Sequence, residues 1–151
     1  MRLLISFFIL FFSSISAQEN KINYIHFKYD ISNVLFSDVE IFIGESNQQK
    51  NYYNVIVKHY KFTNQVEEKL TINSDEFNKI LTQFKKIKND DLINTFESGL
   101  DGAKTSIEVG TLLYNSIKYS VWGLNKKGSK EFIKTVQMLL KIAKIKIEDL
   151  N

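Results

Sequence analysis

Carboxylate side chains concentrated in one short segment are the residues of this sequence best suited to chemistry. The segment covers 89–102, contains two glycines, and its candidate residues are Asp90, Asp91, Glu97 and Asp101. Oxygen ligands on a flexible loop can hold calcium, and two convergent carboxylates can act as general acid and base. The spacing fits no known calcium loop, however, and Asp101-Gly102 before a strand is explained by turn chemistry alone. We therefore favour a structural role for this acidic segment, and predict no cofactor and no metal site.

Aromatic side chains on or beside the expected strands are the second candidate group. A row of rings on an open sheet face can stack on sugars or grip a partner, whereas cross-strand packing is their usual role. The rings are Tyr52, Tyr60, Tyr114, Tyr119 and Trp122. Alternation in the expected strand 117–122 turns Ile117, Tyr119 and Val121 inward and therefore Trp122 and Lys118 outward. An exposed tryptophan among polar neighbours is a candidate binding hot spot.

Lysines form a row on the last expected helix, opposite its apolar stripe. Lys130 and Lys134 belong to this row, and a solvated helix face explains it fully. The functional alternative is a patch that binds an acidic protein or an anionic envelope polymer. The net charge of the whole chain is only +3, so nucleic acid is not an expected partner.

The chain lacks several common catalytic and metal-binding patterns. It contains no cysteine, which excludes disulfides, thiolate metal sites and a cysteine nucleophile. No phosphate-binding loop, nucleophile elbow or His-Glu-x-x-His motif is found. Its two histidines, His26 and His59, lie on different expected strands without zinc-ligand spacing, and we interpret them as strand-face residues.

The N-terminal residues 1–17 have the pattern of a secretory signal peptide. A positive Met1-Arg2 is followed by an apolar run and then by small residues up to Ala17. Cleavage is expected after Ala17, with Ser16 as the alternative. A membrane anchor is the rival interpretation, but a spanning helix needs about 20 apolar residues and this run is shorter. Removing these 17 residues from the 151 leaves 134, with no transmembrane span, in the periplasm or outside the cell.

Hydrophobic periodicity predicts one globular domain of residues 18–151 in the α+β class. Its expected element order is β-β-β-α-β-β-α, with an antiparallel sheet of about five strands and two helices packed on one face. The strands are expected at 22–29, 38–43, 52–62, 104–109 and 117–122, and the helices at 73–87 and from Ser129 to Ala143. We expect Leu92, Ile93 and Phe96 to attach the acidic segment to the core, and the tail 144–151 to fray.

The C-terminal half resembles small uncharacterised exported bacterial proteins of the α+β class. The resemblance rests on Asp101-Gly102-Ala103, an alternating strand, an aromatic return strand and a closing leucine-rich helix, preceded by the amphipathic helix 73–87. The abundance of Lys, Asn and Ile over Arg, Ala and Pro also resembles the composition of proteins from AT-rich bacterial genomes. The resemblance implies the order of elements and no activity.

Three functional hypotheses follow from these patterns. The first is an exported, non-enzymatic binding module of the cell envelope, of the inhibitor or immunity type, whose partner is another envelope or secreted protein. The second is a small hydrolase that uses carboxylates of the acidic segment, for example Glu97 and Asp101. The third is an accessory domain that acts only within a larger assembly. An enzyme needs a pocket in which two carboxylates converge, whereas a binding module needs an exposed patch or sheet edge.

Overall fold

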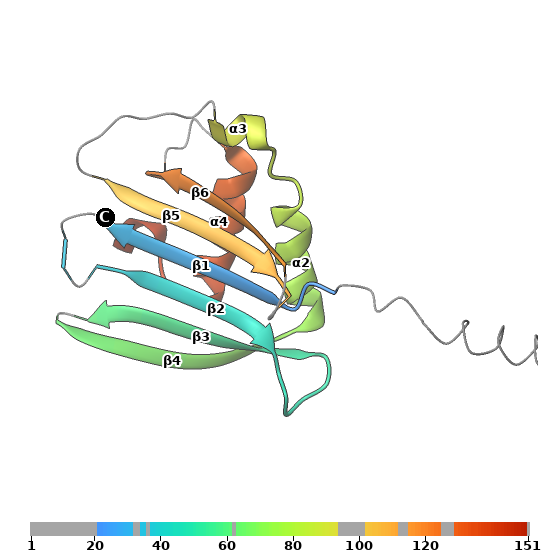
Figure 1. Ribbon diagram of the computed structural model, residues 1–151. Coiled ribbons are helices and arrows are strands. Elements are labelled where there is room, and N and C mark those ends of the chain that lie inside the picture. Colours follow the sequence, from blue (N-terminus) through green and yellow to red (C-terminus); the bar gives the residue numbers. More distant parts are fainter. Residues whose placement is uncertain are drawn as a thin grey trace, which may run out of the picture.

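The computed structural model describes residues 21–31, 34–35, 37–61, 63–93, 102–111, 115–124 and 129–150. These residues form one antiparallel sheet with helices packed against one of its faces, as the α+β prediction requires (Figure 1). Within these ranges no helix is both long enough and apolar enough to span a membrane. The signal-peptide prediction for 1–17 lies outside the described residues.

The sheet has six strands in the order β4-β3-β2-β1-β5-β6, and every neighbouring pair is antiparallel. The strands are β1 (Tyr24–Ile31), β2 (Val39–Glu45), β3 (Tyr52–Lys61), β4 (Asn64–Asn73), β5 (Ala103–Gly110) and β6 (Ser116–Trp122). The first four follow one another as a meander. The chain then crosses through its helices and returns with β5 on the free side of β1, so the first strand lies inside the sheet.

The expected count of about five strands is too low, because the sequence analysis missed β4. Four strands rather than three precede the first helix of the described chain. Strand β4 contains the charged run Glu67-Glu68-Lys69, and most of its residues are exposed. Such an edge strand buries little, so its hydrophobic alternation is too weak to be recognised.

Both expected helices are present, with the expected caps, and a short helix lies between β4 and β5. They are α2 (Ser74–Phe84), α3 (Asn89–Ile93) and α4 (Lys130–Ile142). Asn73 begins α2 with a capping box, in which its side chain accepts from the Glu76 backbone and the Glu76 carboxylate accepts from the Asn73 backbone. Ser129 caps α4 by accepting from the Phe132 backbone. Leu92 packs against the core as expected, whereas Ile93 does not, because 73% of it is exposed, and Phe96 lies outside the described residues.

The core lies between the sheet and helices α2 and α4. Alternate residues of the central strands point into it, and the expected inward residues of the first, second and fifth strands in chain order are buried: Ile25, Phe27, Tyr29, Val39, Ile41, Ile43, Thr105, Ile107 and Val109. Phe77 of α2 stacks on Tyr53 of β3 with ring centroids 3.8 Å apart and planes inclined by 6°. This pair fixes the start of α2 against the sheet.

The C-terminal segment is docked, so the expectation that it frays is wrong. After α4 the chain turns at Lys144, which has a positive φ of 57°, and ends in a 3-10 helix (Ile147–Leu150). Leu150 is only 2% exposed and joins the core, and its carbonyl accepts a hydrogen bond from the Tyr29 hydroxyl. Alternating Ile and Lys concealed this anchor, because Leu150 comes after the periodic pattern has ended.

Candidate functional site

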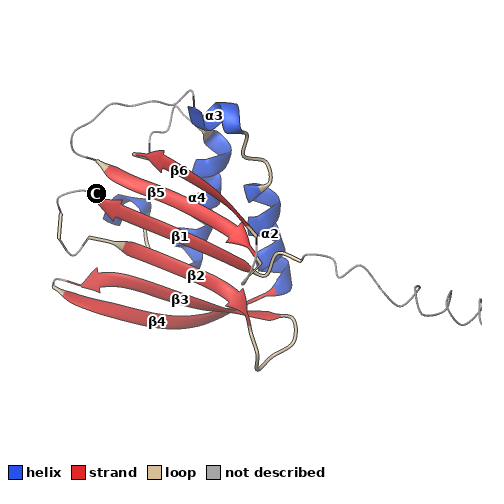
Figure 2. Cartoon of the chain, viewed as in Figure 1, coloured by secondary structure: helices blue, strands red, loops and turns tan. Residues whose placement is uncertain are grey.

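The face of the sheet that points away from α2 and α4 is covered by no described element (Figure 2). We call it the open face. Strand alternation places on it the residues that do not enter the core. On the central strands these include Tyr24, His26, Lys28, Glu40, Phe42, Tyr52, Ile56, Lys58 and Tyr60 on β1 to β3, and Ser106 and Glu108 on β5. Aromatic rings and carboxylates therefore lie close together on this face.

Two aromatic rings lie side by side on the open face, toward the end of the sheet where β1 begins and β2 ends. The Phe42 ring lies over Gly44, where an added Cβ atom would come within 2.8 Å of Phe42 Cε1. Tyr24 lies directly opposite Gly44 on β1, and its ring is nearly parallel to that of Phe42, with centroids 5.9 Å apart and an 18° angle between planes. His26 meets Phe42 edge-on at 6.0 Å. We call Tyr24 and Phe42 the aromatic platform; both rings remain partly exposed.

Two carboxylates hold side chains of the open face in place: Glu108 holds Tyr24 of the platform, and Glu40 holds His26 beside it. The Tyr24 hydroxyl donates to Glu108 Oε1 at 2.7 Å, across the β1–β5 pair. Glu40 Oε1 lies 2.7 Å from His26 Nε2, and its Oε2 lies 3.9 Å from Lys58 Nζ. Hydrogen bonds from Tyr24 and then from Ser116 lower the pKa of Glu108 below its usual value of 4.5. Glu108 is therefore ionised at neutral pH and restricts the Tyr24 ring to one orientation.

Charges beside the platform are largely neutralised within the sheet. Along one row across the strands the residues are Lys28, Glu40, Lys58 and Glu67, so the sign alternates at each strand. Opposite charges directly across neighbouring strands stabilise a sheet by a fraction of a kcal/mol up to about 1 kcal/mol per pair. Because the two lysines and two glutamates of this row neutralise one another, they add no net charge beside the aromatic platform.

Removing the Tyr24 hydroxyl is expected to raise the pKa of Glu108. In Tyr24→Phe the carboxylate loses the first of its stabilising donors, so its pKa should move up toward 4.5, the value of an ordinary glutamate. Because the pKa of Glu108 is lower in the folded protein than in the unfolded chain, its ionisation stabilises the fold at pH values above the unfolded pKa. This stability is lost as the pH falls through the folded pKa. Carbon-detected NMR titration of the Glu108 carboxyl measures the shift. Tyr52→Phe is the control and should leave the Glu108 titration unchanged.

The predicted binding residue Trp122 does lie on the open face, but not beside the platform. It is 38% exposed, and its ring covers Gly102, where an added Cβ atom would come within 2.6 Å of Trp122 Nε1. Trp122 pairs with Lys104 at one end of β5, whereas Glu108 lies near the other end. Lys118 pairs with Glu108 and is exposed, so it borders the platform region. Trp122 and the aromatic platform are therefore separate aromatic positions on the open face, and alternation also places Tyr52 and Tyr60 of β3 there.

Four other predicted site residues that the structure describes, Lys130, Lys134, Asp90 and Asp91, lie on the helices and not on this face. Lys130 and Lys134 are exposed on α4, and Lys134 Nζ lies 3.5 Å from Glu131 Oε1. Asp90 and Asp91 are exposed in the first turn of α3. Tyr114, Glu97 and Asp101 lie outside the described residues, so a hydrolase site in the acidic segment stays a prediction. Nowhere in the described part of the chain do three side chains of the metal-ligating types come together.

The sequence analysis missed the platform residues Tyr24 and Phe42 and the carboxylates beside them. Tyr24 and Glu108 are 84 positions apart, and nothing local connects them. The available signal was the alternation of β1 and β2, which places Tyr24, His26 and Phe42 opposite the buried residues. Combined with Gly44 on the same strand, that pattern indicates an aromatic ring lying flat on the outer side of the sheet.

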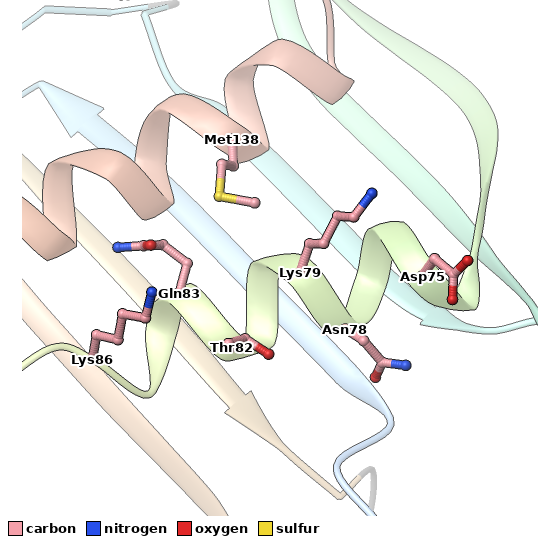
Figure 3. A pocket seen from close by; sticks show the side chains of 7 residues that line it. All are labelled: Asp75, Asn78, Lys79, Thr82, Gln83, Lys86 and Met138. Atoms are coloured by element: carbon pink, nitrogen blue, oxygen red, sulfur yellow. The ribbon is translucent and has the colours of Figure 1, made fainter.

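A groove also runs along the outer side of α2 (Figure 3). Its lining residues are Asp75, Asn78, Lys79, Thr82, Gln83, Lys86 and, from α4, Met138. Gln83 is engaged in holding the helices together, because its Nε2 donates to the Glu131 carboxylate at 2.5 Å. The groove is open to solvent, and Asp75 is the one carboxylate among its lining residues.

The fold and the open face together define a class: an α+β domain with a bare antiparallel sheet face. Models of protein families, curated proteins and solved structures were each compared with the chain, and none of the three comparisons gives a match.

Proposed function

We propose that this chain is an exported bacterial protein whose mature domain is a non-enzymatic binding module of the cell envelope. Its partner, another envelope or secreted protein, docks on the open face. The observation that carries the proposal is the aromatic platform, in which Tyr24 and Phe42 lie nearly parallel on an uncovered sheet. Export is supported by the signal-peptide pattern of residues 1–17.

The arrangement of side chains on the open face suits binding better than catalysis. Glu108 is engaged with Tyr24, and Glu40 with His26 and Lys58, so both carboxylates hold neighbouring side chains. The face is a sheet surface that combines aromatic rings with alternating charges. Aromatic residues in such settings supply much of the binding energy of protein interfaces, while surrounding polar groups fix the register of the partner.

Site-specific photo-crosslinking in the native envelope tests this proposal. A photoreactive amino acid is placed at Lys118 or Lys28 on the open face, and at Gln137 or Thr82 on the helices as matched exposed controls. We expect a cross-linked partner protein from the open-face positions and none from the helix positions. Recovery of the protein in the envelope fraction or the medium tests export in the same experiment.

The platform variants make the test quantitative. Phe42→Ala should weaken capture of the cross-linked partner by about 30-fold or more, the effect of losing an interface hot spot. Gly44→Ala, which displaces the Phe42 ring without changing any charge, should weaken it less. Lys134→Ala on α4 should leave capture unchanged. Cross-links that appear mainly from the helix positions would contradict the proposal, as would a Phe42→Ala variant that binds like the wild type.

A further inference from the structure

The two edges of the sheet differ in how well they are protected against pairing with another strand. Edge strands expose backbone hydrogen-bonding groups, and proteins protect them with charges, lysine above all. Strand β4 carries Glu67, Glu68 and Lys69 in succession and is flanked by polar residues. Strand β6, the opposite edge, has Lys118 as its one charged residue. The β6 edge is therefore less protected than the β4 edge and is the better suited to pair with another strand.

Exposed apolar side chains also gather on β6. Ile117 is 55% exposed although it points toward the helix side of the sheet, and Trp122 is 38% exposed on the open face. On the helix side Ile117 is followed by Tyr119, which packs on Phe84 of α2 with ring centroids 5.1 Å apart, and then by Val121. The apolar layer of the core thus continues to the edge and ends at a side chain in solvent.

The backbone of β6 presents a defined set of groups along this edge. Hydrogen bonds from Gly123 N to Ala103 O and from Thr111 N to Asn115 O show that odd-numbered residues of this hairpin bond to β5. In an antiparallel ladder the alternate residues then point their N–H and C=O groups the other way. On β6 these outward-pointing residues are Ser116, Lys118, Ser120 and Trp122. They form a continuous row of donors and acceptors along the strand.

The sequence of β6 is complementary to itself when a second copy runs antiparallel with Tyr119 opposite Tyr119. In that register Ile117 faces Val121 and Lys118 faces Ser120, so no like charges meet. Ile117, Tyr119 and Val121 of both copies stay on the helix side, and Trp122 stays on the open face opposite Ser116, because a two-fold axis perpendicular to the sheet preserves its two faces. Centring on Lys118 would place two lysines opposite each other, and centring on Ser120 would leave Ile117 uncovered.

We propose that the protein forms a two-fold symmetric dimer through β6, with Tyr119 on the axis and the two sheets joined into one of twelve strands. The strand that pairs with this edge is β6 of a second copy of this chain. Its seven residues match the outward-pointing backbone groups of the first β6 and place apolar side chains opposite apolar side chains. The dimer interface lies beside the open face and leaves the aromatic platform of both copies on the same side. This proposal is independent of the proposed binding function.

Oligomeric state in solution tests the dimer. The protein is expressed from its full-length sequence and its mass is measured by light scattering at about 100 μM, where a dimer with a micromolar Kd is largely formed. We expect a dimer for the wild type, and for Val66→Lys on the β4 edge as matched control. Ile117→Lys places a charge among the apolar residues on the helix side of the interface and should weaken dimerisation at least tenfold. A monomeric wild type overturns the proposal, and so does an Ile117→Lys dimer of unchanged affinity.

The absence of cysteine from the chain allows a direct test of the register. Tyr119→Cys would place two cysteines opposite each other at a non-hydrogen-bonded position, where Cα atoms lie about 4.5 Å apart and a disulfide can form. We expect an intermolecular disulfide under mild oxidation. Ser116→Cys, near the end of the strand, should stay unlinked because its two copies lie far apart. Dimers in which Ser116→Cys cross-links and Tyr119→Cys does not overturn the proposed register.

Discussion

Replacing Phe77 with alanine is expected to lower the free energy of unfolding by about 3–5 kcal/mol, the usual cost of removing a buried phenylalanine. Phe77 is almost completely buried and stacks face to face on Tyr53, with ring centroids 3.8 Å apart. The substitution removes the ring that joins the first turn of α2 to β3 and leaves a cavity beside Tyr53. Because domains of this size have a total stability of about 5–15 kcal/mol, this loss is a large fraction.

Urea unfolding followed by circular dichroism measures this effect. Phe77→Leu is the matched control, since it keeps most of the apolar volume and should cost clearly less than alanine. Asn78→Ala, at the next and exposed position of α2, should change stability by no more than about 0.5 kcal/mol. A Phe77→Ala loss no larger than that of Asn78→Ala would show that α2 is not held by this stack.

Replacing Leu150 with alanine should cost about 2–5 kcal/mol, even though Leu150 lies next to the C-terminal residue. Its side chain is buried in the core, and its carbonyl accepts from the Tyr29 hydroxyl at the end of β1. The last turn therefore anchors the chain end onto the sheet. Tyr29→Phe removes only the hydrogen bond and should cost about 0.5–1.5 kcal/mol.

The control for the chain end is Glu148→Ala on the same 3-10 helix, where the side chain is exposed and the change should be nearly neutral. Thermal and urea unfolding of the three variants separates apolar burial from the hydrogen bond. Equal stability of Leu150→Ala and Glu148→Ala would contradict the docking of the chain end.

The parts of the fold that could be predicted from sequence are those with strong local patterns. Alternation identified the inward residues of β1, β2 and β5, and the caps Asn73 and Ser129 marked where α2 and α4 begin. The missed strand β4 has charged residues at its centre and buries only Ile72 fully, so it has little hydrophobic alternation to be recognised. Leu150 was missed for a related reason, because a single docked side chain has no periodicity.

The candidate site was harder to predict because it depends on the order of strands. Trp122 was identified from alternation alone, and its exposure agrees with that reasoning. Tyr24, Phe42 and Glu108 come together only because β1 lies between β2 and β5, a pairing that the sequence does not specify locally. Residues on an outer sheet face also mix polar and apolar types, so they carry little signal until the sheet is known.

The position of β1 inside the sheet has a consequence for how the protein folds. Ile25 pairs with Ile43 on one side and with Val109 on the other, so its second neighbour lies more than eighty residues further along the chain. Pairing over such a separation makes folding slow, because the entropy of closing a long loop must be lost before the contacts form. The meander β1–β4 can assemble early, but the unpaired side of β1 stays open until β5 has been synthesised and has paired with it.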